Sequence, residues 1–404
     1  MTILILILGI ILFIGLIVIH ELGHFIVARR NGVEAEEFGI FFPPTIYKKK
    51  MKGGWTFSIN ALPLGGFVKL KGEHDSDTEK GSYGAASLWV KSKIMLAGVT
   101  MNLLTALVLL TILAWVGIPN LLPNQYKVAS DTKTISQRVL INDVESGSPA
   151  AKAGLKNNDQ ITSIGLAGHK PTPIKTISDV QSITKRFNGD KVNVYFNRDG
   201  KSQVVTTTLL TTGIVSASQQ KFQSALAHTK LDCANIPLPK GYLGISMAQY
   251  SLQRSTWSAP ITAVGFTVQA TGLTLAGLGH ALGGLGDIIA GTVTGNKVVR
   301  ENGQCTASSQ VAGPVGIFVI LKDSASLGLD FMLFLIAIIS LTLAIMNVLP
   351  IPALDGGRLW LTLITRAIKK PLSPKREEAI VATGMAILLC LMVLITIVDV
   401  NRFL

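Results

Sequence analysis

The residues best suited to chemistry are His20, Glu21 and His24, which form an H-E-x-x-H pattern. At about 3.6 residues per turn, the two histidines fall one turn apart on the same face of a helix, where both imidazoles can bind one metal ion. Glu21 then lies beside the metal, where its carboxylate can take a proton from a metal-bound water. The spacing therefore predicts a metal site that hydrolyses its substrate.

The segment around this pattern is apolar. Apart from the motif itself, nearly all residues from Ile3 to Val27 are hydrophobic. A helix needs about 20 such residues to cross a bilayer. Histidines can also act as hydrogen-bond donors between membrane helices, which is the alternative to a metal site. Because unpartnered histidine and glutamate side chains are costly in hydrocarbon, a bound metal accounts better for their presence.

The composition is that of a membrane protein with a sizeable soluble portion. The chain has 404 residues, of which 48% are hydrophobic, and its mean hydropathy is +0.45. The net charge of +13 comes from scattered basic residues without an aromatic–basic stripe, so we expect no nucleic-acid partner. Basic loops beside anionic lipid are a better use for this charge.

We predict a polytopic α-helical membrane protein with four transmembrane helices, at about residues 2–28, 94–116, 327–348 and 379–398. The segment 260–291 is also apolar, but it contains eight glycines, which weaken a helix. We expect this segment to lean on the membrane as an amphipathic or broken helix without crossing it. Its lone histidine, His280, is interpreted as a polar-face residue and not as a ligand.

Two features near the first two helices carry further polar groups. Residues 38–71 alternate in short strand-like runs and contain a glycine turn at Gly65 and Gly66, which predicts a membrane-associated β-loop. Irregular backbone at membrane depth needs surrounding protein or a water-filled cavity, so an ordinary surface hairpin is the alternative. Asn102, one turn after Gly98 in the second helix, either holds helices together or lies near the active site.

The chain between the second helix and about residue 215 has the pattern of a soluble α+β domain. Residues 148–155, with the sequence S-P-A-A-K-A-G-L, lead into a strand that follows Asp159. Farther on, an Asp-Gly pair marks a hairpin. This segment resembles a PDZ domain, which binds an extended peptide or a chain end at the edge of a sheet. Residues 241–254 are strand-like and belong to the linker that follows.

The two histidines leave a catalytic zinc site one ligand short of the usual three protein ligands. We predict that Asp355 is the third, because it follows an apolar helix that Pro350 and Pro352 interrupt. Two glycines after Asp355 permit a close turn that can bring the carboxylate inward.

Membrane sidedness tests this choice of ligand. If the first three predicted helices each cross once and 260–291 does not, the C-terminal ends of the first and third helices lie on one side. Basic residues concentrate in the loops on that side, as they do on cytoplasmic faces. We therefore expect the active site toward the cytoplasm, with both chain ends and the PDZ-like domain outside.

Three features together resemble the site-2 protease family of intramembrane zinc metalloproteases: the H-E-x-x-H motif, the N-x-x-P-x-P-x-L-D-G-G motif that begins at Asn347, and the PDZ-like segment. The best match is the bacterial branch with an extracytoplasmic PDZ domain, as in regulators of sigma-E-type stress responses. Residues 59–67 and 313–316 are similar to further family segments. Val99 replaces a common family proline, Asn158 replaces a PDZ glycine, and only one PDZ-like unit is visible, which leaves substrate selection open.

The resemblance implies a role for each site residue. Zinc would be bound by His20, His24 and Asp355, with Glu21 as general base. Substrate contacts would come from the polar and glycine-rich positions Asn347, Asn102, Gly65, Gly66 and Phe67. Asn347 would hold the substrate backbone or the developing oxyanion. The substrate would be a single-pass membrane protein of the anti-sigma-factor or signal-peptide-remnant type, trimmed by an upstream site-1 protease in the bacterial inner membrane.

The domain organisation expected from these patterns has four parts: helices one and two with the β-loop (1–117), the PDZ-like domain (118–215), an extracytoplasmic linker (216–326), and helices three and four (327–404). Cys233 and Cys305 both fall outside the membrane and can pair if that side is oxidising.

Two other functions are open. A metallochaperone or transporter would need more polar residues along the second and fourth helices, which look like plain spans. A peptide-binding scaffold that has lost catalysis would not need Glu21.

Overall fold

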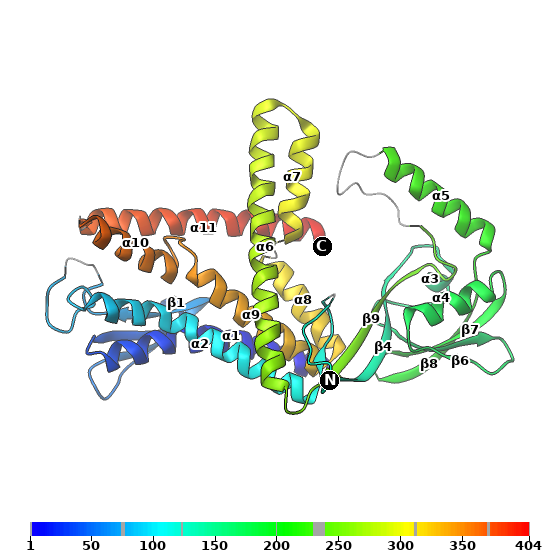
Figure 1. Ribbon diagram of the computed structural model, residues 1–404, viewed down its shortest axis with the longest axis horizontal. Coiled ribbons are helices and arrows are strands. Elements are labelled where there is room, and N and C mark those ends of the chain that lie inside the picture. Colours follow the sequence, from blue (N-terminus) through cyan, green and yellow to red (C-terminus); the bar gives the residue numbers. More distant parts are fainter. Residues whose placement is uncertain are drawn as a thin grey trace. The chain divides into compact units, whose positions relative to one another are not determined.

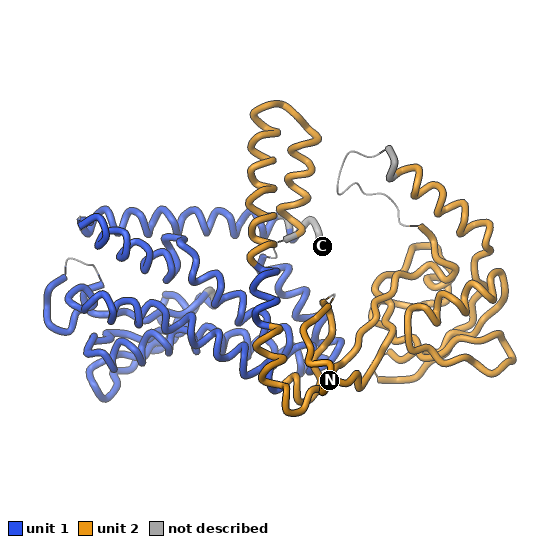
Figure 2. Tube along the Cα trace, in the orientation of Figure 1, with its two compact units in different colours: residues 1–112, 267–274, 312–404 blue, residues 113–266, 275–311 orange. Residues whose placement is uncertain are grey.

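The computed structural model describes residues 2–73, 77–122, 124–198, 200–228, 239–310, 313–369 and 372–403. The chain forms two compact units (Figure 2). Unit 1 comprises residues 1–112, 267–274 and 312–404, and unit 2 comprises residues 113–266 and 275–311. Unit 1 is therefore assembled from segments that lie far apart in the sequence, with unit 2 inserted between them.

Unit 1 is mainly helical (Figure 1). Its helices are α1 (Thr2–Arg30), most of α2 (Leu88–Val116), α8 (Pro314–Leu327), α9 (Leu329–Val348), α10 (Asp355–Ile368) and α11 (Pro374–Phe403). Helices α1, α8 and α9 share a buried apolar core that contains Leu16, Leu321, Ala325, Met332 and Ile336. Because lipid is as apolar as these side chains, close van der Waals packing is what holds such helices together.

The ends of α1 and α9 follow from local sequence. Arg29 and Arg30 occupy the last turn of α1, where positive charge is favourable beside the free carbonyl groups. Gly32 then adopts a φ of 80°, which a glycine reaches without strain. Helix α9 ends at Val348, since Pro350 lacks an N–H and holds the residue before it in an extended conformation.

Among the described residues, five helices are long and apolar enough to cross a membrane. Four of them, α1, α2, α9 and α11, coincide with the predicted spans. The fifth is α6 (Ala259–Thr294), in the segment predicted to lie on the membrane. Helices α7 (Lys297–Gln310) and α8 form a bent pair that passes the same test together. The predicted count of four spans is therefore not confirmed.

Helix α6 is continuous, so the alternative of a broken helix at 260–291 is wrong. Close packing against α7 offsets the low helix propensity of its glycines. A Cβ atom at Gly284 would lie 2.7 Å from the backbone oxygen of Gly303, and one at Gly303 would lie 2.6 Å from that of Gly284. Small residues allow such close approach of two helices. His280 is exposed on α6.

Strands β1 (Ala35–Lys50) and β2 (Thr56–Leu70) form the antiparallel sheet predicted for the β-loop. Residues 37–40 of β1 pair with residues 66–69 and also with residues 56–59 of β2. Residues 45–50 pair with residues 56–60. Within the described part of the chain, the segment 66–70 pairs with β1 alone and therefore forms an edge of this sheet.

A buried asparagine supports the irregular pairing within this sheet. The side-chain amide of Asn60 donates to the carbonyl oxygens of Ile40, at 3.3 Å, and Phe41, at 3.1 Å. These carbonyl groups lie where β1 departs from regular pairing, and a buried carbonyl group needs a donor. Asn60 thus satisfies the backbone where the strand pairing cannot.

Unit 2 contains an antiparallel sheet with the strand order β3-β9-β4-β5-β7-β8, and β6 pairs with β5. The strands are β3 (Ile118–Pro119), β4 (Lys133–Val144), β5 (Gln160–Leu166), β6 (Thr172–Pro173), β7 (Lys191–Arg198), β8 (Lys201–Thr208) and β9 (Ile245–Arg254). Three helices accompany them: α3 (Pro149–Lys152), α4 (Ile177–Arg186) and α5 (Thr212–His228). One face of the sheet packs with α3 and α4 around buried Val139, Ile164, Val180, Val194 and Phe196.

The α+β pattern predicted for residues 118–215 is present, and β9 adds to it. This strand comes from the segment predicted as a linker and pairs with β4 from Lys133–Arg254 to Val144–Ile245. The PDZ identity of this sheet and the four domain boundaries stay predictions. Cys305 lies in α7, whereas Cys233 lies outside the described residues, and so does the predicted pairing.

Candidate metal centre

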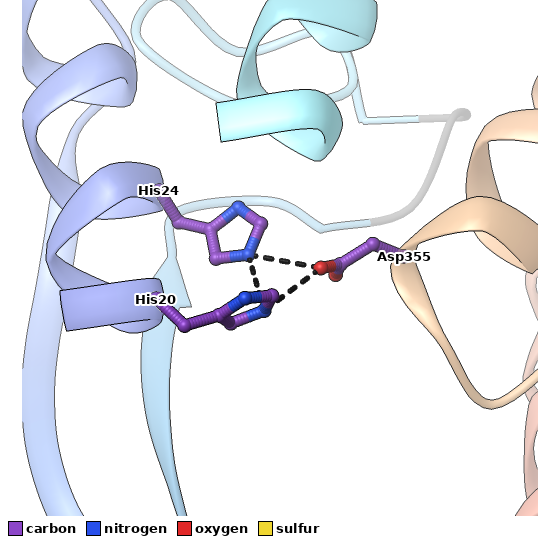
Figure 3. Close-up of side chains that lie close together, drawn as sticks. All are labelled: His20, His24 and Asp355. Atoms are coloured by element: carbon purple, nitrogen blue, oxygen red, sulfur yellow. Dashed lines mark hydrogen bonds and ion pairs between the residues drawn. The ribbon is translucent and has the colours of Figure 1, made fainter. Parts of the chain in front are cut away.

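Two side chains of one helix and a third from far along the sequence meet in unit 1 (Figure 3). His20 and His24 extend from α1, and Asp355 is the first residue of α10. The Oδ2 atom of Asp355 lies 3.0 Å from the Nε2 atom of each histidine, and the two Nε2 atoms are 3.2 Å apart. The three predicted metal ligands are thus brought together.

The donor set and its spacing fit a zinc ion. Ligand atoms about 2.0–2.2 Å from a tetrahedral zinc ion lie roughly 3.3–3.6 Å from one another. The separations of 3.0–3.2 Å between these three atoms are only slightly shorter than that range. Two imidazole nitrogens and one carboxylate oxygen also leave a fourth position for water or substrate, as catalytic zinc sites require.

The turn that precedes α10 positions Asp355. Leu354 is extended, with a φ of −104° and a ψ of 164°, so the chain changes direction just before the aspartate. A Cβ atom at Gly356 would overlap the backbone of Val348, and one at Gly357 would overlap the carbonyl group of Ile351. The glycine pair therefore lets α10 begin against the end of α9, with Asp355 directed toward α1.

Helix α2 orients the second histidine. The Nδ1–H group of His24 donates to the backbone carbonyl of Ile94 at 2.7 Å, and the imidazole is buried. Such a contact to the far nitrogen of an imidazole fixes the ring and leaves Nε2 free to bind a metal. No side chain takes part on the α2 side, so the sequence carries no signal for this interaction.

Gly98 of α2 provides the space for both imidazoles. A Cβ atom at this position would overlap Nε2 of His24 and would lie 2.7 Å from Nδ1 of His20. Any larger residue would therefore push the two rings away from their present positions. Sequence reasoning placed Gly98 on the face of α2 that carries Asn102, but it assigned no role to the glycine.

Glu21 follows His20 on α1 and lies beside strand β2. Its carboxylate lies near the backbone N–H of Val68 and close enough to both histidines and Asp355 to interact with them electrostatically. A Cβ atom at Gly66 would lie 3.0 Å from Cγ of Glu21. The edge segment 66–70 thus runs directly past the predicted general base.

The other predicted substrate-binding residues occupy different surroundings. Asn347 lies half-buried in the last turn of α9, where its side chain has no hydrogen-bond partner among the described residues. Phe67 packs on Gly39 and stacks with Phe42, their ring centroids 6.4 Å apart. Gly65 faces the ring of Phe42. Asn102 is buried at the metal cluster itself, with its amide nitrogen 3.2 Å from Nδ1 of His20.

Comparison with known proteins shows to which family the chain belongs. The sequence profile of peptidase family M50 matches residues 8–391, nearly the whole chain. The chain belongs to peptidase family M50. The predicted membership in the site-2 protease family and the prediction of a peptidase are therefore confirmed. The match does not reveal a PDZ branch.

Related proteins match this chain over nearly its whole length. A provisionally named zinc metalloprotease of Clostridium perfringens is 29% identical, and the match covers 96% of each chain. A provisionally named zinc metalloprotease of Campylobacter jejuni is 28% identical over 96% of this chain and 90% of its own. The provisionally named protease Eep of Enterococcus faecalis is 24% identical over 98% of each. Two of these proteins are named as zinc metalloproteases, which agrees with the predicted zinc cofactor.

The packing at Gly98 generates a prediction. Replacement Gly98→Ala should lower zinc affinity by about 10-fold or more, because the added methyl group displaces both imidazoles. Zinc content of the purified protein after competition with a chelator measures this. Gly15→Ala in α1 is the matched control, since no atom of the described residues outside the adjoining backbone of α1 lies within 4 Å of a Cβ there. Equal zinc retention by both variants would contradict the proposed crowding.

Proposed function

We propose that this protein is an intramembrane zinc endopeptidase that hydrolyses a peptide bond within the transmembrane segment of single-pass membrane proteins. The observation that supports it best is the convergence of His20, His24 and Asp355 between helices that are apolar enough to span a membrane. Polar groups at such depth are expensive unless they partner one another or a cation. The H-E-x-x-H spacing adds a carboxylate of the kind that peptide hydrolysis needs.

Each residue of the site has a distinct part in this mechanism. His20, His24 and Asp355 would hold zinc, which when bound would supply Lewis acidity and lower the pKa of a water molecule toward neutrality. Glu21 would accept a proton from the attacking water and pass it to the nitrogen of the leaving amine as the C–N bond breaks. The amide of Asn347 donates to the carbonyl oxygen as negative charge develops there. Removal of one such donor typically slows a reaction by about 10²–10³-fold.

The edge of the β1–β2 sheet provides a place for the unwound substrate. A transmembrane helix exposes its peptide bonds to attack only where it unwinds, and its backbone then needs new hydrogen-bond partners in the membrane. The segment 66–70 is an edge strand, and a peptide can extend such an edge by strand addition. Because Gly66 and Val68 lie beside Glu21, a substrate strand on this edge would run past the general base.

The rest of the chain would select and deliver the substrate. We assign the sheet of unit 2 to a PDZ-like domain outside the cytoplasm, which would bind the end of a substrate trimmed by an upstream protease. In a bacterial inner membrane, the intramembrane cleavage would then follow an earlier cleavage of the substrate on the outer side. The substrate class would be anti-sigma factors or signal-peptide remnants, as the family resemblance implies.

Sidedness constrains the number of crossings. Asp355 begins α10 after the C-terminal end of α9 and reaches histidines near the C-terminal end of α1. If α1, α2 and α9 each cross, the chain between α2 and α9 must cross an even number of times. Four spans satisfy this condition, and so do six, with α6 and the α7–α8 pair both crossing. Five spans do not.

A glutamine at position 21 separates metal binding from catalysis. Glu21→Gln should retain zinc, because the three ligands are intact, and should slow cleavage of a membrane-embedded reporter by about 10²–10⁴-fold. Purified protein in liposomes with a single-pass reporter allows both measurements on one sample. Undiminished cleavage would refute Glu21 as the base. Loss of cleavage with intact zinc disfavours a metal transporter.

The third ligand is tested by metal content alone. Asp355→Ala should reduce bound zinc by at least 10-fold, because two imidazoles bind zinc far more weakly than a complete three-ligand site. Asp330→Ala, in the first turn of α9, is the matched control and should retain zinc. Full zinc occupancy in the Asp355 variant would remove this residue from the site.

Labelling at the two ends of α6 tests the four-span arrangement. Trp257→Cys and Val293→Cys replace exposed residues near its ends, with relative exposures of 65% and 82%. Both should react with an impermeant thiol reagent from the outer side of intact cells, because α6 is expected to lie on the membrane. Labelling of the two positions from opposite sides would show that α6 crosses and would favour six spans.

A further inference from the structure

We propose that Asn102 is a positioning residue whose side-chain carbonyl accepts a hydrogen bond from Nδ1–H of His20 and thereby directs Nε2 of that imidazole to the metal. This inference rests on the zinc site proposed above. It assigns Asn102 to the metal centre, where the sequence left a choice between holding helices together and contacting the substrate.

Both nitrogen atoms of His20 have close neighbours. Nε2 lies 3.0 Å from Oδ2 of Asp355, within the cluster of metal ligands. Nδ1, on the other side of the ring, lies 3.2 Å from the side-chain amide of Asn102. Asn102 is 1% exposed, so water has little access to this contact. The imidazole is thus held between a ligand and a buried amide.

Metal binding determines which atom carries the proton. A neutral imidazole has one N–H group, and the nitrogen that binds a metal must offer its lone pair. Since Nε2 of His20 lies among the ligands, the hydrogen belongs on Nδ1. The Nδ1–H group is a donor and needs an acceptor. The NH₂ group of Asn102 cannot accept a hydrogen bond, but the Oδ1 atom of Asn102 can.

The amide of Asn102 is able to present that oxygen. A turn of about 180° about the Cβ–Cγ bond exchanges Oδ1 and Nδ2 with almost no change of shape. Among the described residues, the buried Oδ1 atom has no hydrogen-bond partner when Nδ2 faces His20. With Oδ1 toward His20, this oxygen gains the Nδ1–H donor. The chemistry of the bound metal therefore selects this orientation.

The position of Asn102 is itself fixed. The hydroxyl group of Ser340, in α9, donates to the backbone carbonyl of Asn102 at 2.8 Å, and both residues are buried. Ile94, Gly98 and Asn102 are four residues apart along α2 and hence share one helix face. Ile94 accepts from His24, Gly98 makes room for both rings, and Asn102 contacts His20. One face of α2 therefore orients both imidazoles.

Two substitutions separate the acceptor from the bulk of the side chain. Asn102→Leu keeps a similar volume without an acceptor and should lower zinc affinity by about 10–100-fold, as loss of such contacts does elsewhere. Asn102→Asp keeps an oxygen at this position and should bind zinc at least 10-fold more tightly than the leucine variant. Competition with a chromogenic chelator, on purified full-length protein, measures zinc affinity without reference to activity.

A control distinguishes ring positioning from helix attachment. Ser340→Ala removes the bond that ties α9 to the Asn102 backbone but leaves the His20 contact in place. Ser340→Ala should lower the thermal unfolding temperature while zinc affinity stays near that of the unmodified protein. Asn102→Leu should lower zinc affinity with a smaller change in unfolding temperature. A purely structural Asn102 would give both variants the same pattern, and that result would overturn the proposal.

Failure of this inference is distinguishable from failure of the proposed function. If Asn102→Leu binds zinc as the unmodified protein does while Asp355→Ala does not, Asn102 has no positioning role and the metal site stands. If neither variant loses zinc, Asp355 is not a ligand and the three-ligand site of the proposed function is refuted. The cobalt-substituted protein provides a second readout, because the visible absorption of Co²⁺ should change in Asn102→Leu and return toward normal in Asn102→Asp.

Discussion

The contact of three polar side chains inside an apolar bundle is the interaction on which unit 1 depends. Alone, each of His20, His24 and Asp355 would be expensive in hydrocarbon. Together, with their ligand atoms 3.0–3.2 Å apart, they form a site that a cation can complete. The surrounding elements serve this contact: prolines end α9 before the aspartate, and two glycines let α10 begin against α9. In the proposed function, peptide hydrolysis at membrane depth then needs only a base and an extended substrate, and both are assigned to the surroundings of strand β2.

Helix α2 supplies no predicted ligand, yet it shapes both imidazoles. It does so with a backbone carbonyl, a missing side chain and one amide, at positions 94, 98 and 102. Contacts to the far nitrogen of a metal-binding histidine raise its basicity and restrict its rotation. Such a helix tolerates few shifts along its axis, because a displacement by one residue would place a side chain where the two rings now lie. The ligand helix and its neighbour are thus matched to each other residue by residue.

Sequence reasoning succeeded where the information is local and failed where it depends on tertiary contacts. The H-E-x-x-H spacing, the Pro350–Pro352 interruption and the glycine pair after Asp355 are each visible in a few adjacent letters, and they sufficed to propose the three ligands. The carbonyl of Ile94 has no residue signature, so its bond to His24 could not be anticipated. Strand β9 joins β4 across a long insertion, and the continuity of α6 depends on its packing against α7. Propensity alone does not contain either contact.

The separation of the ligands along the chain has a consequence during synthesis of the protein. His20 and Asp355 are 335 positions apart. At synthesis rates of about 5–20 residues per second, roughly 20–70 s pass between their emergence from the ribosome. During this interval the nascent chain already has its first two helices and its glutamate, but not the carboxylate that completes the metal site. If the proposed function holds, an interrupted chain is therefore inert, and membrane proteins being inserted nearby would meet no active protease until this chain is almost complete.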